Sequence, residues 1–241
     1  MGGKNRMLII DHLDKHYKGT DKGVTDISIH VEPGDIYAFI GHNGAGKTTL
    51  LKAITGIHPF DKGHVIIDGI DLKENPEEVK RRIAYIPDNP DIYEFLTGIQ
   101  YLQLIGDVFH VPAADRETCI ADYAERFEIT GSLGDLISSY SHGMKQKLVL
   151  ISAFLHKPKL LIMDEPFVGL DPKAAFILKE LMKEVTASGN AIFFSTHVLE
   201  VAEKLCNKVA IIKDGKLISS GRMEEVVKED TSLEDLFMKT V

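Results

Sequence analysis

The sequence predicts an α/β fold with a mainly parallel sheet, because short apolar runs alternate with segments whose apolar residues have helical spacing. The apolar runs are residues 35–40, 160–163 and 191–195, and each is typical of a buried strand. A glycine-rich loop and a helical segment follow the first run, and another helical segment separates the other two. Strands connected through helices in this way usually lie parallel in one sheet.

One long stretch has a different pattern. Residues 75–157 are mainly helical, and within them residues 89–157 are expected to be inserted into the α/β core. We therefore expect a single domain over residues 1–241, with the core at about residues 1–88 and 158–241 and a helical subdomain between them.

Several local signals define the elements of the N-terminal part. Residues 7–10 and 24–31 are predicted to be strands, and residues 47–55 a helix. The dipeptide Asp68-Gly69 suits a tight primed turn, so it predicts a hairpin over residues 64–72.

Caps and turns define the elements of the C-terminal part. Ser141 is a suitable N-cap for a helix with a regular apolar face, and Asp171 for a later helix with Pro172 at its first position. An Asp-Gly pair at 214–215 predicts a second hairpin. The acidic segment 224–235 is expected to be a helical tail with a solvated face.

Composition limits the possible functions. The chain has 28 Lys and Arg residues against 36 Asp and Glu residues, a net charge of −8, so nucleic acid is not expected as its main partner. Its 2 cysteines lie far apart, which favours a reduced, cytoplasmic setting. No segment reaches the roughly 20 mostly apolar residues of a spanning helix, so any work at a membrane requires another chain that crosses it.

The segment 41–49, GHNGAGKTT, matches the phosphate-binding pattern G-x-x-x-x-G-K-[ST] between a predicted strand and a predicted helix. Glycines let backbone N–H groups curl around phosphate oxygens, and the N-terminus of the following helix attracts the same anion. Lys47 is expected to contact the β- and γ-phosphates and the Thr48 hydroxyl a Mg²⁺ ion. The alternative is a glycine-rich turn that binds nothing, which the flanking strand and helix disfavour.

Two acidic residues, Asp164 and Glu165, end the apolar run at 160–163. A parallel strand carries such residues to the edge of the sheet where ligands bind. Asp164 would hold Mg²⁺ through water, and Glu165 would orient or deprotonate the attacking water, a contribution of about 10²–10⁴-fold in rate. Alone this pattern is usually only a strand end, but together with the phosphate loop it indicates a hydrolytic site.

The chain resembles the ATP-binding domain of ABC transporters over nearly its whole length, because the motifs of that family occur in the expected order. After the phosphate loop come the signature motif at 140–144 (YSHGM), the Walker B strand at 160–164 followed by Glu165, the D-loop at 168–171 (VGLD), and His197 in FFSTH. Tyr17 matches the aromatic residue that stacks on adenine in this family.

The resemblance implies a P-loop NTPase fold, with a RecA-like core, an N-terminal antiparallel β subdomain and an inserted helical subdomain. It implies an ATPase subunit that powers small-molecule transport, export more than import, through separate membrane-spanning permease subunits. Through these partners the ATPase subunit would lie at the inner, cytoplasmic face of the membrane. Two such subunits would pair head to tail around two ATP molecules, so that Ser141 and Gly143 reach the γ-phosphate of the partner's ATP.

The resemblance and the motifs together define three sets of expected site residues. The catalytic residues are Lys47, Glu165 and His197. The metal-binding residues are Thr48, Asp88 and Asp164. The ATP-binding residues are Tyr17, Gly41, His42, Asn43, Gly44, Ala45, Gly46, Lys47, Thr48, Thr49, Ser141, Gly143 and Asp171.

The chain departs from the family pattern at two places. The signature has Tyr140, His142 and Met144 where the family has Leu, Gly and Gln. Asp88 stands at the position of the Q-loop glutamine. A carboxylate can bind a metal ion or accept a hydrogen bond from water, but it cannot donate a hydrogen bond as an amide does. Both variants resemble a bacterial branch often associated with drug or small-molecule export.

Other interpretations stay open from the sequence. Tyr17 can be a surface aromatic, His197 a capping or core histidine, and Ser141 simply a helix cap. At the level of function, one alternative is a soluble ABC-type ATPase that acts on ribosomes or DNA, although such relatives usually carry two ATPase domains or long inserts. Another is a nucleotide-gated interaction module without useful hydrolysis.

Overall fold

The computed structural model describes residues 6–19, 22–227 and 232–240. Contacts group the chain into two units. The first is formed from Met1–Tyr85, Lys159–Pro166 and Met182–Val241, and the second from Ile86–Pro158 and Phe167–Leu181. The second unit holds the predicted helical insertion and also Phe167–Leu181, which follows the Walker B strand in the sequence. The domain boundaries themselves remain a prediction.

Within the described residues, the first unit contains a four-stranded sheet in the order β2-β1-β4-β5. Its strands are β1 (Leu8–His16), β2 (Gly23–Val31), β4 (Lys62–Ile67) and β5 (Ile70–Asp71). All of the pairings are antiparallel, which confirms the predicted N-terminal subdomain. Asp68 and Gly69 join β4 to β5 with φ angles of 48° and 79°, as a primed turn requires.

Strand β1 is longer than the predicted segment 7–10. Its register with β2 shifts between Ile10 and Leu13 and again between Leu13 and Lys15, and His12 has a φ of 48°. These irregularities interrupt the alternation of inward and outward side chains. The sequence pattern therefore ends before the strand does.

The second sheet has six strands among the described residues, in the order β10-β9-β3-β8-β7-β6. They are β3 (Ile36–Ile40), β6 (Ile83–Ile86), β7 (Leu160–Asp164), β8 (Ala191–Thr196), β9 (Lys208–Lys213) and β10 (Lys216–Arg222). The β3–β8, β3–β9 and β7–β8 pairs are parallel and β9–β10 is antiparallel, which confirms the mainly parallel sheet and the second hairpin. Every residue of β3, β7 and β8 is buried, as expected for strands covered on both faces.

The helical prediction for residues 75–157 is wrong at β6. Helix α2 (Pro76–Arg82) leads directly into this four-residue strand, which lies beside β7. No glycine separates the two elements, and four residues are too few to show a period. Pairing with the sheet, which is a tertiary interaction, decides the conformation here.

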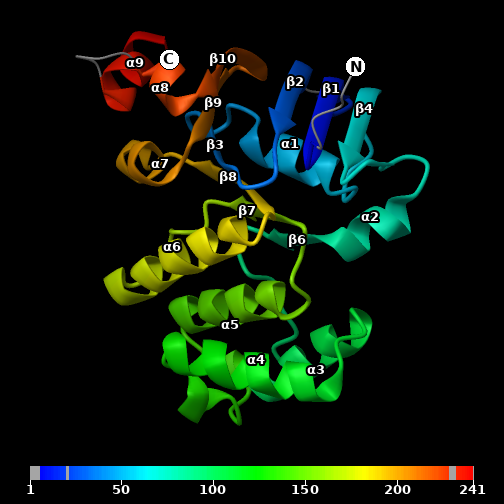
Figure 1. Cartoon of the computed structure of the whole chain (residues 1–241), viewed down its shortest axis with the longest axis vertical. Coiled ribbons are helices and arrows are strands. Elements are labelled where there is room, and N and C mark those ends of the chain that lie inside the picture. Colours follow the sequence, from blue (N-terminus) through cyan, green and yellow to red (C-terminus); the bar gives the residue numbers. More distant parts are fainter. Residues whose placement is uncertain (1–5, 20–21, 228–231, 241) are drawn as a thin grey trace. The chain divides into compact units, whose positions relative to one another are not determined.

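The helices of the first unit include α1, which packs against β1 and β2 of one sheet and β7 of the other (Figure 1). Its Leu50, Leu51 and Ile54 are fully buried, so the N-terminus of α1 has a rigid support. The helices lying wholly in this unit are α1 (Lys47–Ile54), α2, α7 (Leu199–Leu205), α8 (Met223–Val226) and α9 (Leu233–Thr240). The predicted acidic tail thus contains two short helices, and residues 228–231 of it lie outside the described residues.

In the second unit, α3, α4 and α5 pack against one another (Figure 1). The helices are α3 (Gly98–Val108), α4 (Ala113–Arg126), α5 (His142–Leu155) and the first part of α6 (Pro172–Ala187), with single 3₁₀ turns at Thr130–Ser132 and Ile137–Ser139. Ser141 Oγ accepts a hydrogen bond from the Met144 N–H at 3.3 Å, which confirms its role as the N-cap of α5. In the described part of the chain, we find no helix with the length and apolar character needed to cross a membrane.

Candidate functional site

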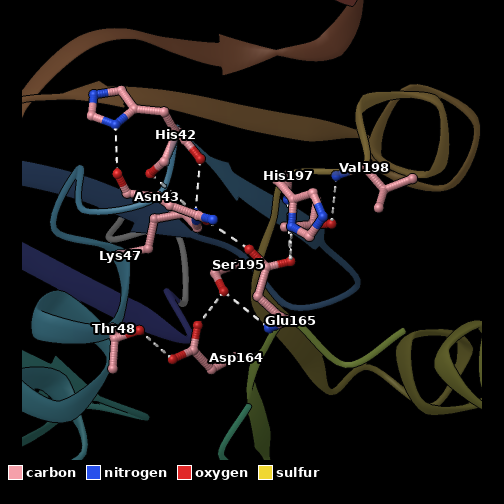
Figure 2. Close-up of polar contacts among 11 residues, drawn as sticks. His42, Asn43, Lys47, Thr48, Asp164, Glu165, Ser195, His197 and Val198 are labelled. Atoms are coloured by element: carbon pink, nitrogen blue, oxygen red, sulfur yellow. Dashed lines mark hydrogen bonds and ion pairs between the residues drawn. The ribbon is translucent and has the colours of Figure 1, made fainter. Parts of the chain in front are cut away.

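The predicted phosphate loop connects the carboxyl end of β3 to the N-terminus of α1 (Figure 2). Gly46 precedes the helix with a φ of 108°, and Lys47 is its first residue. The Ala45 carbonyl accepts a hydrogen bond from the Gly215 N–H at 3.0 Å, which holds the loop against the turn between β9 and β10. The N–H groups of the first helical turn have no partners within the helix and can bind an anion.

Gly46 is required here for two separate reasons. Its left-handed φ strains any residue with a Cβ. A Cβ at this position would also lie 2.8 Å from Val24 Cγ1 and 3.1 Å from the Gly23 carbonyl oxygen. The loop therefore lies tightly against β2, and this close approach sets its shape.

Lys47 lies inside the loop. Its Nζ donates to the Gly41 carbonyl at 2.7 Å and to the His42 carbonyl at 3.4 Å, and it lies 3.3 Å from Glu165 Oε1. The side chain is only 7% exposed. A buried ammonium group is strongly attracted to anions, so this position suits the binding of a phosphate group.

Asp164, at the end of β7, links three elements. Its Oδ2 accepts a hydrogen bond from Thr48 Oγ1 at 2.6 Å, and its Oδ1 accepts one from Ser195 Oγ (Figure 2). The residue is 1% exposed. Ser195 pairs with Asp164 in the parallel register of β7 and β8, so this register places its hydroxyl beside the carboxylate.

The oxygen atoms of Thr48 and Asp164 fit a Mg²⁺ ion, which prefers oxygen ligands. No group of three or more His, Cys, Asp or Glu side chains suited to a metal occurs in the residues that the structure describes. That is compatible with Mg²⁺, which is commonly held by one or two protein groups and completed by water and substrate phosphates.

Glu165 lies between Lys47 and His197 (Figure 2). Its Oε2 accepts a hydrogen bond from the His197 main-chain N–H at 3.2 Å and lies 2.9 Å from His197 Nδ1. Its own N–H donates to the Ser195 carbonyl at 3.2 Å and to Ser195 Oγ at 3.0 Å, with a left-handed φ of 49°. The Glu165 side chain is 13% exposed and the His197 side chain is 53% exposed. The carboxylate is therefore mostly shielded from solvent, whereas the imidazole reaches it.

The structure thus brings Lys47, Thr48, Asp164, Glu165 and His197 together in the first unit. The sequence analysis did not single out Ser195, which contacts both acidic residues. Its position just before Thr196-His197 in the FFSTH motif is a local signal that could have identified it. Tyr17 also belongs to this unit, directly after β1.

The signature segment lies in the second unit, at the N-terminus of α5. Tyr140 is buried and its hydroxyl donates to the Ser132 carbonyl at 2.6 Å, so this residue fixes the start of the motif. His142 is exposed, and a Cβ on Gly169 would lie 2.6 Å from its Cδ2 atom. A Cβ on Gly143 would lie 3.1 Å from the Gly169 carbonyl oxygen. The signature and the D-loop are therefore in direct contact within one subunit.

The D-loop residue Asp171 has two partners in the same unit. Its Oδ1 accepts a hydrogen bond from the Ala174 N–H at 2.8 Å, so it caps α6, and its Oδ2 lies 2.7 Å from Lys147 Nζ. The hydrogen bond from Lys147 and that from the Ala174 N–H lower the pKa of Asp171. The contact with Lys147 was not foreseen from the sequence, because the two residues lie on different helices.

Asp88 belongs to the second unit and is exposed. Its Oδ1 accepts a hydrogen bond from the N–H of Asn89 at 2.9 Å. Binding of a metal ion by Asp88 remains a prediction.

We expect Asp171→Ala to lower the free energy of unfolding by about 1 kcal/mol, because the mutation removes the cap of α6. Asp171→Asn, which keeps a capping oxygen but loses the charge, is the matched control and should cost less. Since the folded-state pKa is lowered, the advantage of the wild type over Asp171→Asn should be present at neutral pH and shrink as the pH falls below about 4. Urea unfolding at several pH values measures both effects, and a difference that does not depend on pH would contradict the ion pair.

Comparison with known proteins assigns the family. The family model described as ABC transporter matches residues 24–168. The chain belongs to the ABC transporter family. It is the ATP-binding subunit of an ABC transporter, and as such it binds nucleotide and is an ATPase.

Curated relatives and solved structures agree with this assignment. The ABC ATPase is 34% identical over 218 residues to the ABC-type transporter ATP-binding protein EcsA of Bacillus subtilis, covering 89% of this chain and 88% of EcsA. It is 31% identical over 215 residues to the linearmycin resistance ATP-binding protein LnrL of the same organism, covering 89% of this chain and 69% of LnrL. A solved ATP-binding subunit of an ABC transporter superposes with a TM-score of 0.92 at 34% identity, covering 97% of this chain and 99% of that one.

Proposed function

We propose that this ABC ATPase powers the export of a small molecule through separate membrane-spanning subunits, while it remains at the inner face of the membrane. The observation that carries the catalytic part of the proposal is the arrangement of Lys47 and His197 on either side of the Glu165 carboxylate. The export direction is supported by the similarity to a subunit named for linearmycin resistance. Attachment through partners is in keeping with the absence of a spanning helix in residues 6–19, 22–227 and 232–240.

In this proposal the phosphate loop binds the triphosphate of ATP, with Lys47 neutralising its charge. Thr48 and Asp164 would hold Mg²⁺, which would supply charge stabilisation for the phosphoryl group. Glu165 would act as the base that orients or deprotonates the attacking water, and the hydrogen bond from the His197 N–H keeps its carboxylate in place. Ser195 would position both acidic residues.

We further propose that two subunits pair head to tail, with Ser141 and Gly143 of one facing the nucleotide of the other. Ser141 lies at the N-terminus of α5, a 14-residue helix whose dipole favours a negative charge at that end. Gly143 leaves the main chain at the first turn uncovered by a side chain. Asp171 would contribute through the D-loop, which touches the signature at Gly169.

The experiment for this proposal measures phosphate release and molecular mass together. Purified protein with Mg²⁺ and ATP should form a dimer by light scattering. It should release phosphate at a rate per chain that rises with protein concentration, since the complete site needs two chains. Gentle extraction from membranes should recover a strongly apolar partner chain. A rate per chain that does not change with concentration would contradict the shared site, and recovery of a nucleic acid or ribosomal partner would contradict the transport proposal.

A strain that lacks this gene tests the direction of transport. It should accumulate more of the transported compound from the medium than its parent does, and restoring the gene should reverse the accumulation. Reduced accumulation would indicate import and contradict export.

A further inference from the structure

Tyr17 directly follows β1, at the end of the β1–β2 ladder that the phosphate loop approaches. The preceding residue, His16, pairs with Gly23 at the end of the β1–β2 ladder. The Gly23 carbonyl oxygen is the atom that would lie 3.1 Å from a Cβ on Gly46. Tyr17 is partly buried, and its main-chain N–H donates to the Lys22 carbonyl at 3.1 Å. Its backbone is therefore fixed at the end of the β1–β2 ladder.

His58 holds the side chain of Tyr17. The Tyr17 hydroxyl and His58 Nδ1 form a hydrogen bond of 3.0 Å, in a partly buried position. The two rings also meet edge to face, with centroids 5.8 Å apart and an interplanar angle of 85°. A hydrogen bond and an edge contact together restrict both torsion angles of the tyrosine side chain.

His58 is itself fixed to α1. His58 lies just beyond the C-terminal end of α1, and its main-chain N–H donates to the carbonyl of Lys52 in the helix at 3.0 Å. Helix α1 therefore has the phosphate loop at its N-terminus and the support of Tyr17 at its C-terminus. The phosphate loop and the residue that contacts the Tyr17 hydroxyl are therefore connected through one helix.

Lys15 contacts the face of the same ring. Its Nζ lies over the Tyr17 ring at 5.2 Å from the centroid, and the residue is only 9% exposed. A buried lysine amine so placed occupies one face of the ring by a cation–π contact. In the proposed site, the base would stack on the opposite face.

We propose that His58 is a positioning residue that holds the Tyr17 ring in place for the adenine base of ATP. The inference rests on the proposed nucleotide site and on the expectation from the family resemblance that Tyr17 stacks on the base. His58 does not touch the nucleotide in this proposal. It acts through the tyrosine hydroxyl and ring edge, so its effect depends on a ligand that carries a base.

The test compares two ligands, Mg²⁺-ATP and inorganic tripolyphosphate, by calorimetric titration of the full chain. His58→Phe keeps the aromatic edge but removes the hydrogen bond, and we expect it to raise the dissociation constant for ATP about three- to tenfold, the effect of one hydrogen bond. Its affinity for tripolyphosphate should not change, because that ligand has no base. His58→Asn, which can still accept from the Tyr17 hydroxyl, should restore much of the ATP affinity.

Tyr17→Phe removes the other end of the same hydrogen bond. It should weaken ATP binding as much as His58→Phe does, and the double variant should be no weaker than either single one, since both remove one interaction. Unfolding midpoints of all variants show whether each still folds.

Three results with the variants would overturn the inference. They are unchanged ATP affinity in His58→Phe, an equal loss for ATP and tripolyphosphate, and losses that simply add in the double variant. Each leaves the proposed function standing. If the wild type bound tripolyphosphate and ATP equally well, Tyr17 would have no role in base binding and the inference would fail with it. If the wild type bound neither, the proposed nucleotide site itself would fail.

Discussion

Replacing Glu165 with glutamine should lower the rate of ATP hydrolysis by about 10²–10⁴-fold while ATP binding is kept. The amide keeps the size of the side chain and can still accept from the His197 N–H, but it cannot take a proton from water. Removing the negative charge also leaves the Lys47 ammonium without its carboxylate partner, so affinity for the anionic triphosphate should be equal or higher. The ATP-bound dimer should consequently persist instead of dissociating after hydrolysis.

Phosphate release and light scattering in the presence of Mg²⁺ and ATP measure these two effects separately. Glu224→Gln, on the exposed helix α8 of the same unit, is a matched control and should behave as the wild type. If Glu165→Gln hydrolysed ATP as fast as this control, Glu165 would not be the base. If the variant lost both turnover and the ATP-bound dimer, the role of Glu165 would be in ATP binding.

Replacing Lys47 with alanine should raise the dissociation constant for ATP by about 10- to 100-fold, because a charge-assisted hydrogen bond to phosphate is lost. The ammonium is buried, so no mobile cation from solvent replaces it fully. The mutation also removes the donor that contacts the Gly41 and His42 carbonyls, which should loosen the loop. Titration with ATP measures the affinity, and thermal unfolding measures the effect on the loop.

Lys52→Ala is the matched control, since it removes the same type of residue from the last turn of the same helix. It should bind ATP as the wild type does. Wild-type affinity in both the Lys47 and the Lys52 variant would show that Lys47 makes no contact with the phosphates. A large loss in both variants would point to disruption of α1 and not to a specific contact.

The buried strands of the mainly parallel sheet and the local helix caps were largely predictable from the sequence. The strands at β3, β7 and β8 are fully buried and so appear as continuous apolar runs. Ser141 and Asp171 are local caps, whose partners lie three residues away in the chain. Strand β6 and the irregular part of β1 could not be found in this way, because their conformations depend on pairing with distant strands.

The sequence also identified most of the residues that meet in the first unit, since the phosphate loop and the Asp164-Glu165 pair are contiguous motifs. It did not indicate His58 and Ser195 in the first unit, or Lys147 in the second, as partners of the expected site residues. Their partners lie 41, 31 or 30, and 24 positions away, respectively, and no repeat or spacing rule connects such pairs.

The sequence by itself determined the family, the order of the motifs and the chemical types available at each of them. Only the tertiary structure decided that Thr48 donates to Asp164, that Lys47 and His197 lie on either side of Glu165, and that His58 holds Tyr17. The physical reason is that motifs are local in the chain, whereas hydrogen bonds across a site are set by strand register and helix packing. A shift of one residue in the β7–β8 register would move Ser195 away from Asp164, although every motif would still be present.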